Sequence, residues 1–282
     1  MRKTALLFAG MFVAGTLTVS LSAQQAKPVA TTQKPTDVNT LLFEMANTMG
    51  MLRAIQQEDS IITLELWAKG TVTTGGQKSD IPEYRMSVNY AVPGMRVDYQ
   101  RQMGTGKPQR IIEVVSGGAA WNETDRGIGA TPARDQAKQR AVMLWTTPMG
   151  VYKAAKMAGA RATMKAAGPN TWTLTFPLPA PAEDVTATAT VRQDASLLAR
   201  PNPAALKILT GTYISQVETT GAVVSQSTYS EYGDWNYEDY LADIFQPRRM
   251  TRRAGDTTFD LTTVNTNTYN PYVIMPVPAN VK

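Results

Sequence analysis

The sequence has no cysteine and no histidine, and only 18% of its 282 residues are charged. Without these two residue types the chain cannot form a disulfide, an imidazole general base, or an ordinary zinc, haem-thiolate or iron–sulfur site. Any catalysis would depend on carboxylates, Lys, Tyr, Ser or Thr, and any metal ion would be bound by oxygen ligands. We therefore expect a non-catalytic binding or structural protein that holds no cofactor and no metal.

A strong charge of either sign is also missing. The formal net charge is +5, which is too small to indicate nucleic acid or an anionic membrane surface as a partner. What the chain does have is apolar side chains, because 43% of its residues are hydrophobic. That fraction, at this length, is enough to build a substantial core.

The first 23 residues have the features of a secretory signal peptide. Arg2 and Lys3 precede an apolar stretch, residues 5–19, that is too short to span a bilayer and is followed by Ala23. We expect cleavage after Ala23 and a location in the periplasm or outside the cell, so the mature protein would not span a membrane. An uncleaved membrane anchor is the alternative for the same segment. Residues 24–36 are polar, contain two prolines and are predicted to form a tether.

Residues 38–55 are predicted to form an amphipathic helix, because apolar side chains recur there at three- and four-residue spacing. Met45, Met49 and Leu52 belong to this apolar stripe, and Gly50 weakens the helix slightly. The unbranched methionine side chains either fill a core or form an adaptable lid over an apolar ligand, because they repack easily. The sequence allows both interpretations.

After residue 60 the apolar residues mostly alternate with polar ones, which is typical of strands with one solvated face. The predicted strands are residues 84–90, 95–99, 111–116, 119–121, 171–178, 185–191, 212–218, 223–232, 245–253 and 258–267. Residues 132–158 differ, because Ala, Lys, Gln and Met are common there. We expect two helices in that segment, one beginning at Pro132 and one at Pro148.

Consecutive alternating segments of this kind indicate an antiparallel sheet rather than strand–helix–strand units. We predict an α+β fold in which residues 37–282 form a single domain. Its sheet would be a curved antiparallel one, an incomplete β-barrel, with the helices packed on its concave face. That arrangement would leave a concave apolar interior.

Five segments then occur in an order that matches a known superfamily. They are residues 92–99 (VPGMRVDY), 115–121 (VSGGAAW), 229–232 (YSEY), 246–250 (QPRRM) and 275–278 (MPVP). This succession resembles the outer-membrane lipoprotein-sorting (LolA-like) superfamily. The resemblance implies an exported, incomplete antiparallel barrel with helices plugging its concave side, and a lipid or a lipoprotein acyl chain as the ligand.

Residues 144–150 (LWTTPMG) and 228–232 (TYSEY) more closely resemble the non-catalytic N-terminal region that precedes the metallo-β-lactamase-fold domain of some secreted hydrolases. The catalytic domain of those hydrolases has a histidine-rich metal motif, and this sequence contains no histidine, so their chemistry is not implied. Val92 stands where the lipoprotein carriers often have Arg, which separates the chain from specific lipoprotein handling. Hydrophobic-ligand binding is what the resemblance implies.

The leading hypothesis is an exported binding protein that holds a lipid, a lipoprotein acyl chain or another apolar molecule, with the helix of residues 38–55 as a lid. The candidate ligand-binding residues combine the apolar stripe of that helix with strand positions expected to face inward. They are Met45, Met49, Leu52, Tyr84, Met86, Val97, Tyr99, Trp121 and Trp172. The tryptophans could equally belong to a core.

The alternative is an interaction module whose cavity is filled by its own helices. It would dock a partner, such as a separately encoded hydrolase, through the hairpin of residues 231–245. That hairpin contains five carboxylates and five aromatic residues, and the candidate docking residues are Tyr232, Trp235, Tyr237 and Tyr240. Its carboxylates could instead pair with the arginines of residues 248–253 and only set the strand register. A carboxylate-based hydrolase is a third hypothesis, which needs an acid with a raised pKa in a cleft.

Overall fold

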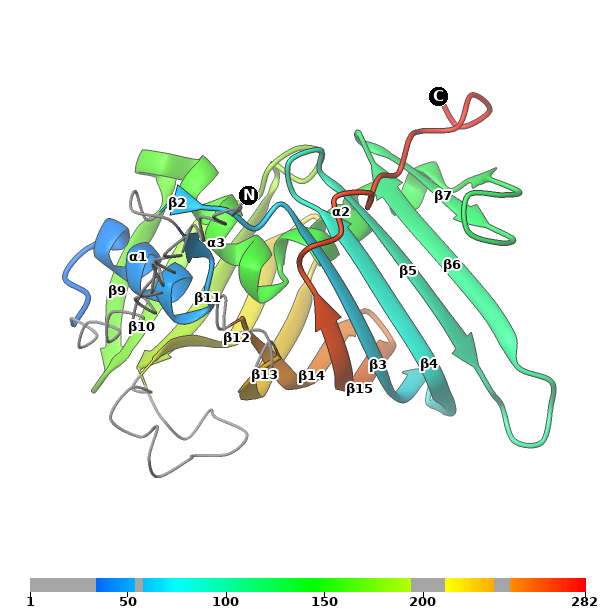
Figure 1. The fold of residues 1–282 in the computed structure, drawn as a ribbon, viewed down its shortest axis with the longest axis horizontal. Helices are drawn as coiled ribbons and strands as arrows, with labels where there is room; N and C mark the ends of the chain where they lie inside the picture. The colour runs from blue at the N-terminus through cyan, green and yellow to red at the C-terminus, as the bar shows by residue number, and fades with distance from the viewer. Residues whose placement is uncertain (1–33, 54–57, 194–210, 236–243) are drawn as a thin grey trace, which may run out of the picture. The chain divides into compact units, whose positions relative to one another are not determined.

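In the described residues, an antiparallel sheet of 13 strands forms the body of the protein (Figure 1). The computed structural model describes residues 34–53, 58–193, 211–235 and 244–282, so the predicted signal peptide and most of the predicted tether lie outside it. The strands are β3 (Thr63–Thr74), β4 (Gln77–Asn89), β5 (Gly94–Arg101), β6 (Gln109–Ser116), β7 (Ala119–Glu123), β8 (Thr131–Pro132), β9 (Thr163–Gly168), β10 (Thr171–Pro177), β11 (Val185–Gln193), β12 (Thr212–Gly221), β13 (Ser225–Asp234), β14 (Phe245–Ala254) and β15 (Thr257–Asn267). Their order across the sheet is β8-β7-β6-β5-β4-β3-β15-β14-β13-β12-β11-β10-β9.

The sheet is curved and, within the described residues, not closed, which confirms the predicted incomplete barrel (Figure 1). Strands β8 and β9 stand at its two edges, although they follow each other in the order of strands along the chain. Strand β15 pairs with β3 on one side and with β14 on the other, so it joins strands β3–β8 to strands β9–β14. The register shifts between Ala68 and Gly70 in β3 and between Thr263 and Asn265 in β15. Such bulges bend strands and increase their twist.

The chain passes from β8 to β9 through helices, and these helices cross the concave face (Figure 1). They are η1 (Arg134–Gln136), α2 (Ala137–Trp145), α3 (Pro148–Ala158) and η2 (Gly159–Arg161). Helix α2 packs against β5, β6 and β7, α3 packs against β10, and α1 (Val38–Thr48) contacts α3 and β12. The predicted break between the two middle helices is confirmed, since Thr147 Oγ1 caps α3 by accepting a hydrogen bond from Gly150 N (3.1 Å). No helix in the described ranges is long and apolar enough to cross a membrane.

Two predicted helix boundaries are wrong. The first helix ends at Thr48 rather than at residue 55, because Gly50 adopts a left-handed conformation (φ 71°) in which a helix does not continue. Leu52 instead enters the short strand β1 (Leu52–Arg53), which pairs with β2 (Glu58–Asp59). Pro132 begins no helix, because it ends β8 and pairs with Trp121, and α2 begins at Ala137.

Two hydrophobic clusters stabilise the sheet. The larger one lies on the concave side, between the sheet and the helices. The smaller one lies on the outer face, where the C-terminal tail covers β6 and β7. Its members are Ile112, Val114, Trp121, Val273, Met275 and Val281. We expected Trp121 on the concave face, and this expectation is wrong: Trp121 is paired with Val114 and lies under the tail.

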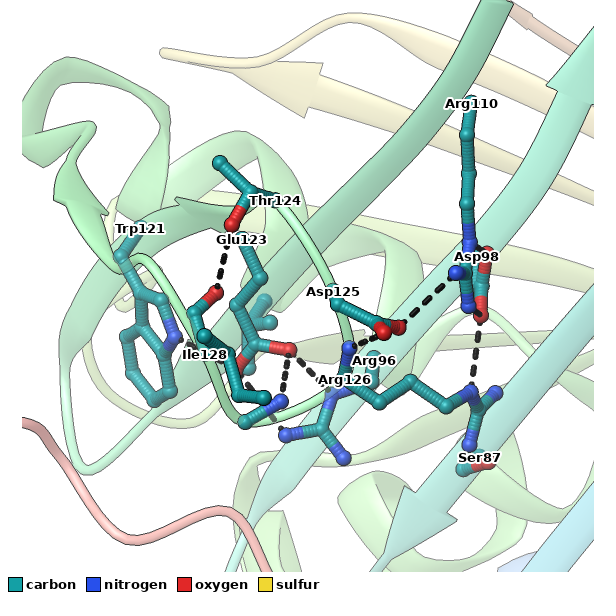
Figure 2. Close-up of polar contacts among 12 residues, drawn as sticks. Ser87, Arg96, Asp98, Arg110, Trp121, Glu123, Thr124, Asp125, Arg126 and Ile128 are labelled. Carbon is teal, nitrogen blue, oxygen red and sulfur yellow. Dashed lines mark hydrogen bonds and ion pairs between the residues drawn. The ribbon is translucent and has the colours of Figure 1, made fainter.

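Beside the outer cluster lies the carboxylate of Glu123 (Figure 2), whose side chain is 2% exposed. It accepts hydrogen bonds from Arg96 Nε (2.9 Å) and Nη2 (3.0 Å), from Trp121 Nε1 (2.9 Å) and from Gly127 N (2.8 Å). Burial alone would raise the pKa of the Glu123 carboxyl, but these hydrogen bonds outweigh burial and hold its pKa below the ordinary value. The outer face of β5–β7 is therefore fixed by one fully bonded carboxylate.

Candidate ligand-binding cavity

An open cavity of about 710 Å³ lies between α2 and the concave face of the sheet. Small-molecule sites commonly have volumes of about 300–1,000 Å³, so this space is large enough for a ligand. Its apolar walls come from α2, from β5 and β15 and from the turn between β12 and β13. They include Tyr99, Met143, Val223, Val224 and Phe259. Its charged lining residues are Glu113, Arg140, Arg252 and Asp256.

A smaller pocket of about 40 Å³ adjoins this cavity and is mostly apolar. Met143, Arg252 and Phe259 line both spaces. The pocket reaches the junction of α2 and α3, since Pro148 also lines it. On the side of the sheet its lining includes Met86 of β4. The two spaces together form a hollow that is polar toward the solvent and apolar toward the core.

Three aromatic rings form the wall of this hollow on the side of the sheet. Tyr84 and Tyr99 are cross-strand partners on β4 and β5, and Phe259 meets both of them, with ring centroids 6.3 Å and 5.5 Å away. Edge-to-face packing of this kind stabilises clusters of aromatic rings. Burial raises the pKa of both tyrosines, that of Tyr99 to about 12, so their hydroxyls stay neutral at physiological pH. The wall thus presents uncharged ring surface to the cavity.

Arg140 of α2 has a structural role in the same cavity. It is 6% exposed, and its Nη1 donates to the carbonyl oxygens of Val114 (3.1 Å) and Trp121 (2.6 Å). Its Nη2 donates to Glu113 Oε1 (3.2 Å) and Asn122 Oδ1 (2.6 Å). Burial lowers the pKa of this guanidinium, and Glu113 opposes that shift. Arg140 therefore fastens α2 to β6 and β7, and its charge is already neutralised.

Arg252 of β14 differs from Arg140 because its guanidinium makes no hydrogen bond and no ion pair with any of the described residues. Its cross-strand partners are Ser227 of β13 and Phe259 of β15, so its side chain shares the concave face with theirs. Arg252 is partly buried, and burial lowers its pKa. A guanidinium nevertheless stays protonated in proteins. Within the described part of the chain, the guanidinium of Arg252 is therefore a positive charge in the hollow without a partner.

The interpretation that the hairpin carboxylates pair with the following arginines is confirmed for Glu231 and Arg249. Arg249 Nε lies 3.7 Å from Glu231 Oε1, and both side chains are about half exposed. Arg252 does not take part, because the register places it on the opposite face of β14 from Arg249. Glu238, Asp239 and Asp243 lie outside the described residues.

The predicted ligand-binding residues fall into three groups. Tyr84 and Met86 line the small pocket and Tyr99 lines the larger cavity. Met45, Met49, Val97 and Trp172 are buried in the main core, away from these two spaces, and Leu52 packs at its margin. Helices α1 and α3 fill the end of the half-barrel under β10 and β12. The helix beside the hollow is α2 and not the predicted lid α1, while Trp121 is on the outer face.

The predicted docking residues are split by their burial. Tyr232 is 1% exposed, and its hydroxyl donates to Ile214 O (2.8 Å), so it is a core residue and offers no ring to a partner. Trp235 is partly buried, and its Nε1 donates to Gln246 O (3.1 Å). Tyr237 and Tyr240 lie outside the described residues. Docking through this hairpin stays a prediction.

A further hollow, of about 600 Å³, lies on the outer face and is lined by Trp67, Arg85, Asp98, Arg110 and Arg126, among others. The carboxylate of Asp98 pairs there with Arg110 and Arg126, at 2.8 Å each (Figure 2). Arg85, Arg110 and Arg126 are all paired with carboxylates, so none of these guanidinium groups is available to the head group of a ligand. Among the described residues, no three carboxylates lie close enough to form a metal site.

No protein-family model and no curated protein matches the sequence. Solved structures are similar to the chain in fold, beginning with an outer-membrane lipoprotein-sorting protein domain from Vibrio parahaemolyticus (8% identity, TM-score 0.46, 81% of this chain and 92% of that chain). A DUF1329 family protein from Desulfovibrio piger matches at 10% identity and a TM-score of 0.40, over 82% of this chain and 92% of that one. The lipoprotein LppX of Mycobacterium tuberculosis matches at 11% identity and a TM-score of 0.28, over 84% and 100%. Similarity this distant identifies no ligand.

Sequence reasoning missed Met143, Arg252 and Phe259, the three residues that line both parts of the hollow. A signal for Arg252 was available in the alternation of β14. Met250 packs against the main core, and Arg252 is two positions further along the same strand, so both face inward. The interpretation that the arginines of residues 248–253 pair with the hairpin carboxylates treats Arg252 like Arg249 and Arg253, although the alternation places it on the other face.

Proposed function

We propose that the protein is a non-catalytic binding protein that holds an apolar or amphipathic molecule, such as a lipid or a lipoprotein acyl chain, in the concave hollow. The observation that carries the proposal is the open cavity of about 710 Å³, which has polar and aromatic walls and continues into a mostly apolar pocket. Burial of apolar surface contributes about 25 cal/mol per Å², so a single hydrocarbon chain would gain several kcal/mol. Met143 on α2 would be the side chain that adjusts to the ligand, because an unbranched thioether repacks easily.

The chemistry of the lining supports binding rather than bond-breaking. The two tyrosines of the wall are kept neutral by burial, and Arg140 is committed to carbonyl, amide and carboxylate partners. Neither supplies a poised base or nucleophile. The sequence features of residues 1–23 support export, and an exported protein would meet lipids and lipoproteins in the cell envelope.

A tryptophan at position 143 should block the hollow. Met143 projects from α2 between the cavity and the pocket, so Met143→Trp would occupy space that the ligand needs. We expect the affinity for a neutral apolar probe such as N-phenylnaphthylamine to fall at least about tenfold. That factor corresponds to about 1.4 kcal/mol, or roughly two buried methylene groups. Probe fluorescence, titrated into delipidated protein, measures the change.

Met157→Trp is the matched control, because Met157 lies on α3 and is 59% exposed. Its affinity for the probe should equal that of the wild type. Equal affinities for wild type and Met143→Trp would place the probe elsewhere and contradict the proposed site. A wild-type protein that binds no probe would contradict the proposed function itself.

A further inference from the structure

We propose that the bound molecule is a single-chain amphiphile with a carboxylate head group, and that Arg252 is the residue that pairs with this head group. The inference rests on the proposed function and makes it more specific. It depends on where Arg252 lies and on what surrounds it.

Arg252 lies where the two parts of the hollow meet, since it lines both the open cavity and the apolar pocket. Met143 and Phe259 line the same junction. A head group at the guanidinium would therefore place the first carbons of its chain against a thioether and an aromatic ring. This is the arrangement of charge and apolar surface that an amphiphile presents.

The other charged groups of the hollow are already neutralised or solvated. Glu113 pairs with Arg140 (3.2 Å), and Asp256 is exposed in the turn between β14 and β15. Arg252 is the charged group that remains, partly buried and without a partner among the described residues. A desolvated, unpaired charge is costly in a free protein. A ligand carboxylate would remove that cost when it binds.

A second donor that lines the pocket also lacks a partner in the described part of the chain. Gln246 of β14 is 1% exposed and lines the apolar pocket, and its Nε2 has no hydrogen-bond partner in the described part of the chain. Buried amide groups are normally satisfied. Gln246 and Arg252 both line the apolar pocket, so the two side chains offer donors to a ligand that brings acceptors.

The guanidinium favours a carboxylate in particular. Its planar fork of N–H groups matches the two oxygens of a carboxylate, which can accept both hydrogen bonds at once. The cavity of about 710 Å³ is the size of sites that hold one small ligand. A single-chain fatty acid is the simplest molecule that fits both the charge and the space.

Three amphiphiles with the same twelve-carbon chain test the inference: laurate, dodecanol and dodecyltrimethylammonium, each titrated calorimetrically below its micelle concentration. Wild-type protein should bind laurate about ten- to a hundredfold more tightly than dodecanol, the range for a charge-assisted hydrogen bond. It should bind the cation most weakly. Arg252→Gln should lose the preference for laurate while keeping its affinity for dodecanol, and Arg252→Lys should keep part of the preference.

Arg253→Gln is the control, because Arg253 is exposed and lies on the other face of β14; it should bind like the wild type. A thermal melt of each variant confirms folding, and loss of the unpaired guanidinium should not lower the melting temperature. Wild-type protein that binds laurate and dodecanol equally, or an Arg252→Gln variant that still prefers laurate, would overturn the inference and leave the proposed function standing. If none of the three amphiphiles binds, both fail.

Discussion

Replacing Arg140 by methionine should lower the free energy of unfolding by about 2–4 kcal/mol, because removal of the buried guanidinium would leave its hydrogen-bond acceptors without a donor. Methionine fills much of the same volume but donates no hydrogen bond. The carbonyl oxygens of Val114 and Trp121 would lose their donor, and an acceptor left unpaired inside a protein costs about 1–3 kcal/mol. Glu113 would also face the cavity without its cation.

Lys138→Met is the matched control for this substitution. Lys138 lies on the same helix and also forms an ion pair, with Asp184 at 2.6 Å, but both side chains are substantially exposed. Exposed pairs contribute about 0–1 kcal/mol, so this variant should unfold at nearly the wild-type urea concentration. Similar unfolding midpoints for the two variants would show that Arg140 does not fasten α2 to the sheet.

Replacing Glu123 by glutamine should destabilise the protein by about 3 kcal/mol at neutral pH, because it leaves Arg96 without its carboxylate. The loss should depend on pH in a defined direction. The pKa of Glu123 in the folded protein lies below its ordinary value of 4.5. The stabilisation by the ionised carboxylate is therefore complete above about pH 4.5 and disappears as the pH falls through the folded pKa. Urea unfolding should therefore show a smaller difference in the free energy of unfolding between wild type and variant at about pH 3 than at about pH 7.

Asp125→Asn is the control that tests whether the burial of Glu123 causes the loss of stability expected for Glu123→Gln. Asp125 lies in the loop that follows β7, two residues after Glu123, and pairs with Arg110 (Figure 2), but its side chain is 60% exposed. We expect Asp125→Asn to change the free energy of unfolding by less than about 1 kcal/mol at either pH. A Glu123→Gln variant whose stability relative to wild type is the same at both pH values would contradict the assignment of Glu123 as an ionised, hydrogen-bonded carboxylate.

Much of the fold could be predicted from local patterns. The alternation of Thr with apolar residues in β10 and β11, and the Pro-Gly turn between β4 and β5, identify hairpins because strand periodicity and turn chemistry are local properties. Helix boundaries were harder to predict from the sequence. Gly50 was noted only as a weak point of the first helix, whereas its left-handed backbone ends that helix. Pro132 is held in a strand by its pairing with Trp121, a contact that local propensity does not reveal.

The site was harder to predict because it depends on which face of each strand is the inner one. In β6, Ile112 and Val114 face the outer cluster, while Ile111 and Val115 face the main core. Alternation cannot distinguish two apolar faces, and the tail that covers the outer one is far away in sequence. For the same reason Trp121 was placed on the wrong side. Arg252 was missed because an inward arginine contradicts the general rule that charged side chains face solvent.

We propose above that an apolar chain enters the hollow beside α2. A crystal structure of the protein with a fatty acid that carries bromine at its chain end tests this most directly, because anomalous scattering locates the bromine independently of the refined chain. We expect a bromine peak within about 4 Å of apolar atoms that line the hollow, such as those of Met143 or Phe259. A bromine peak on the outer face under the C-terminal tail, or a hollow that contains only ordered water, would contradict it.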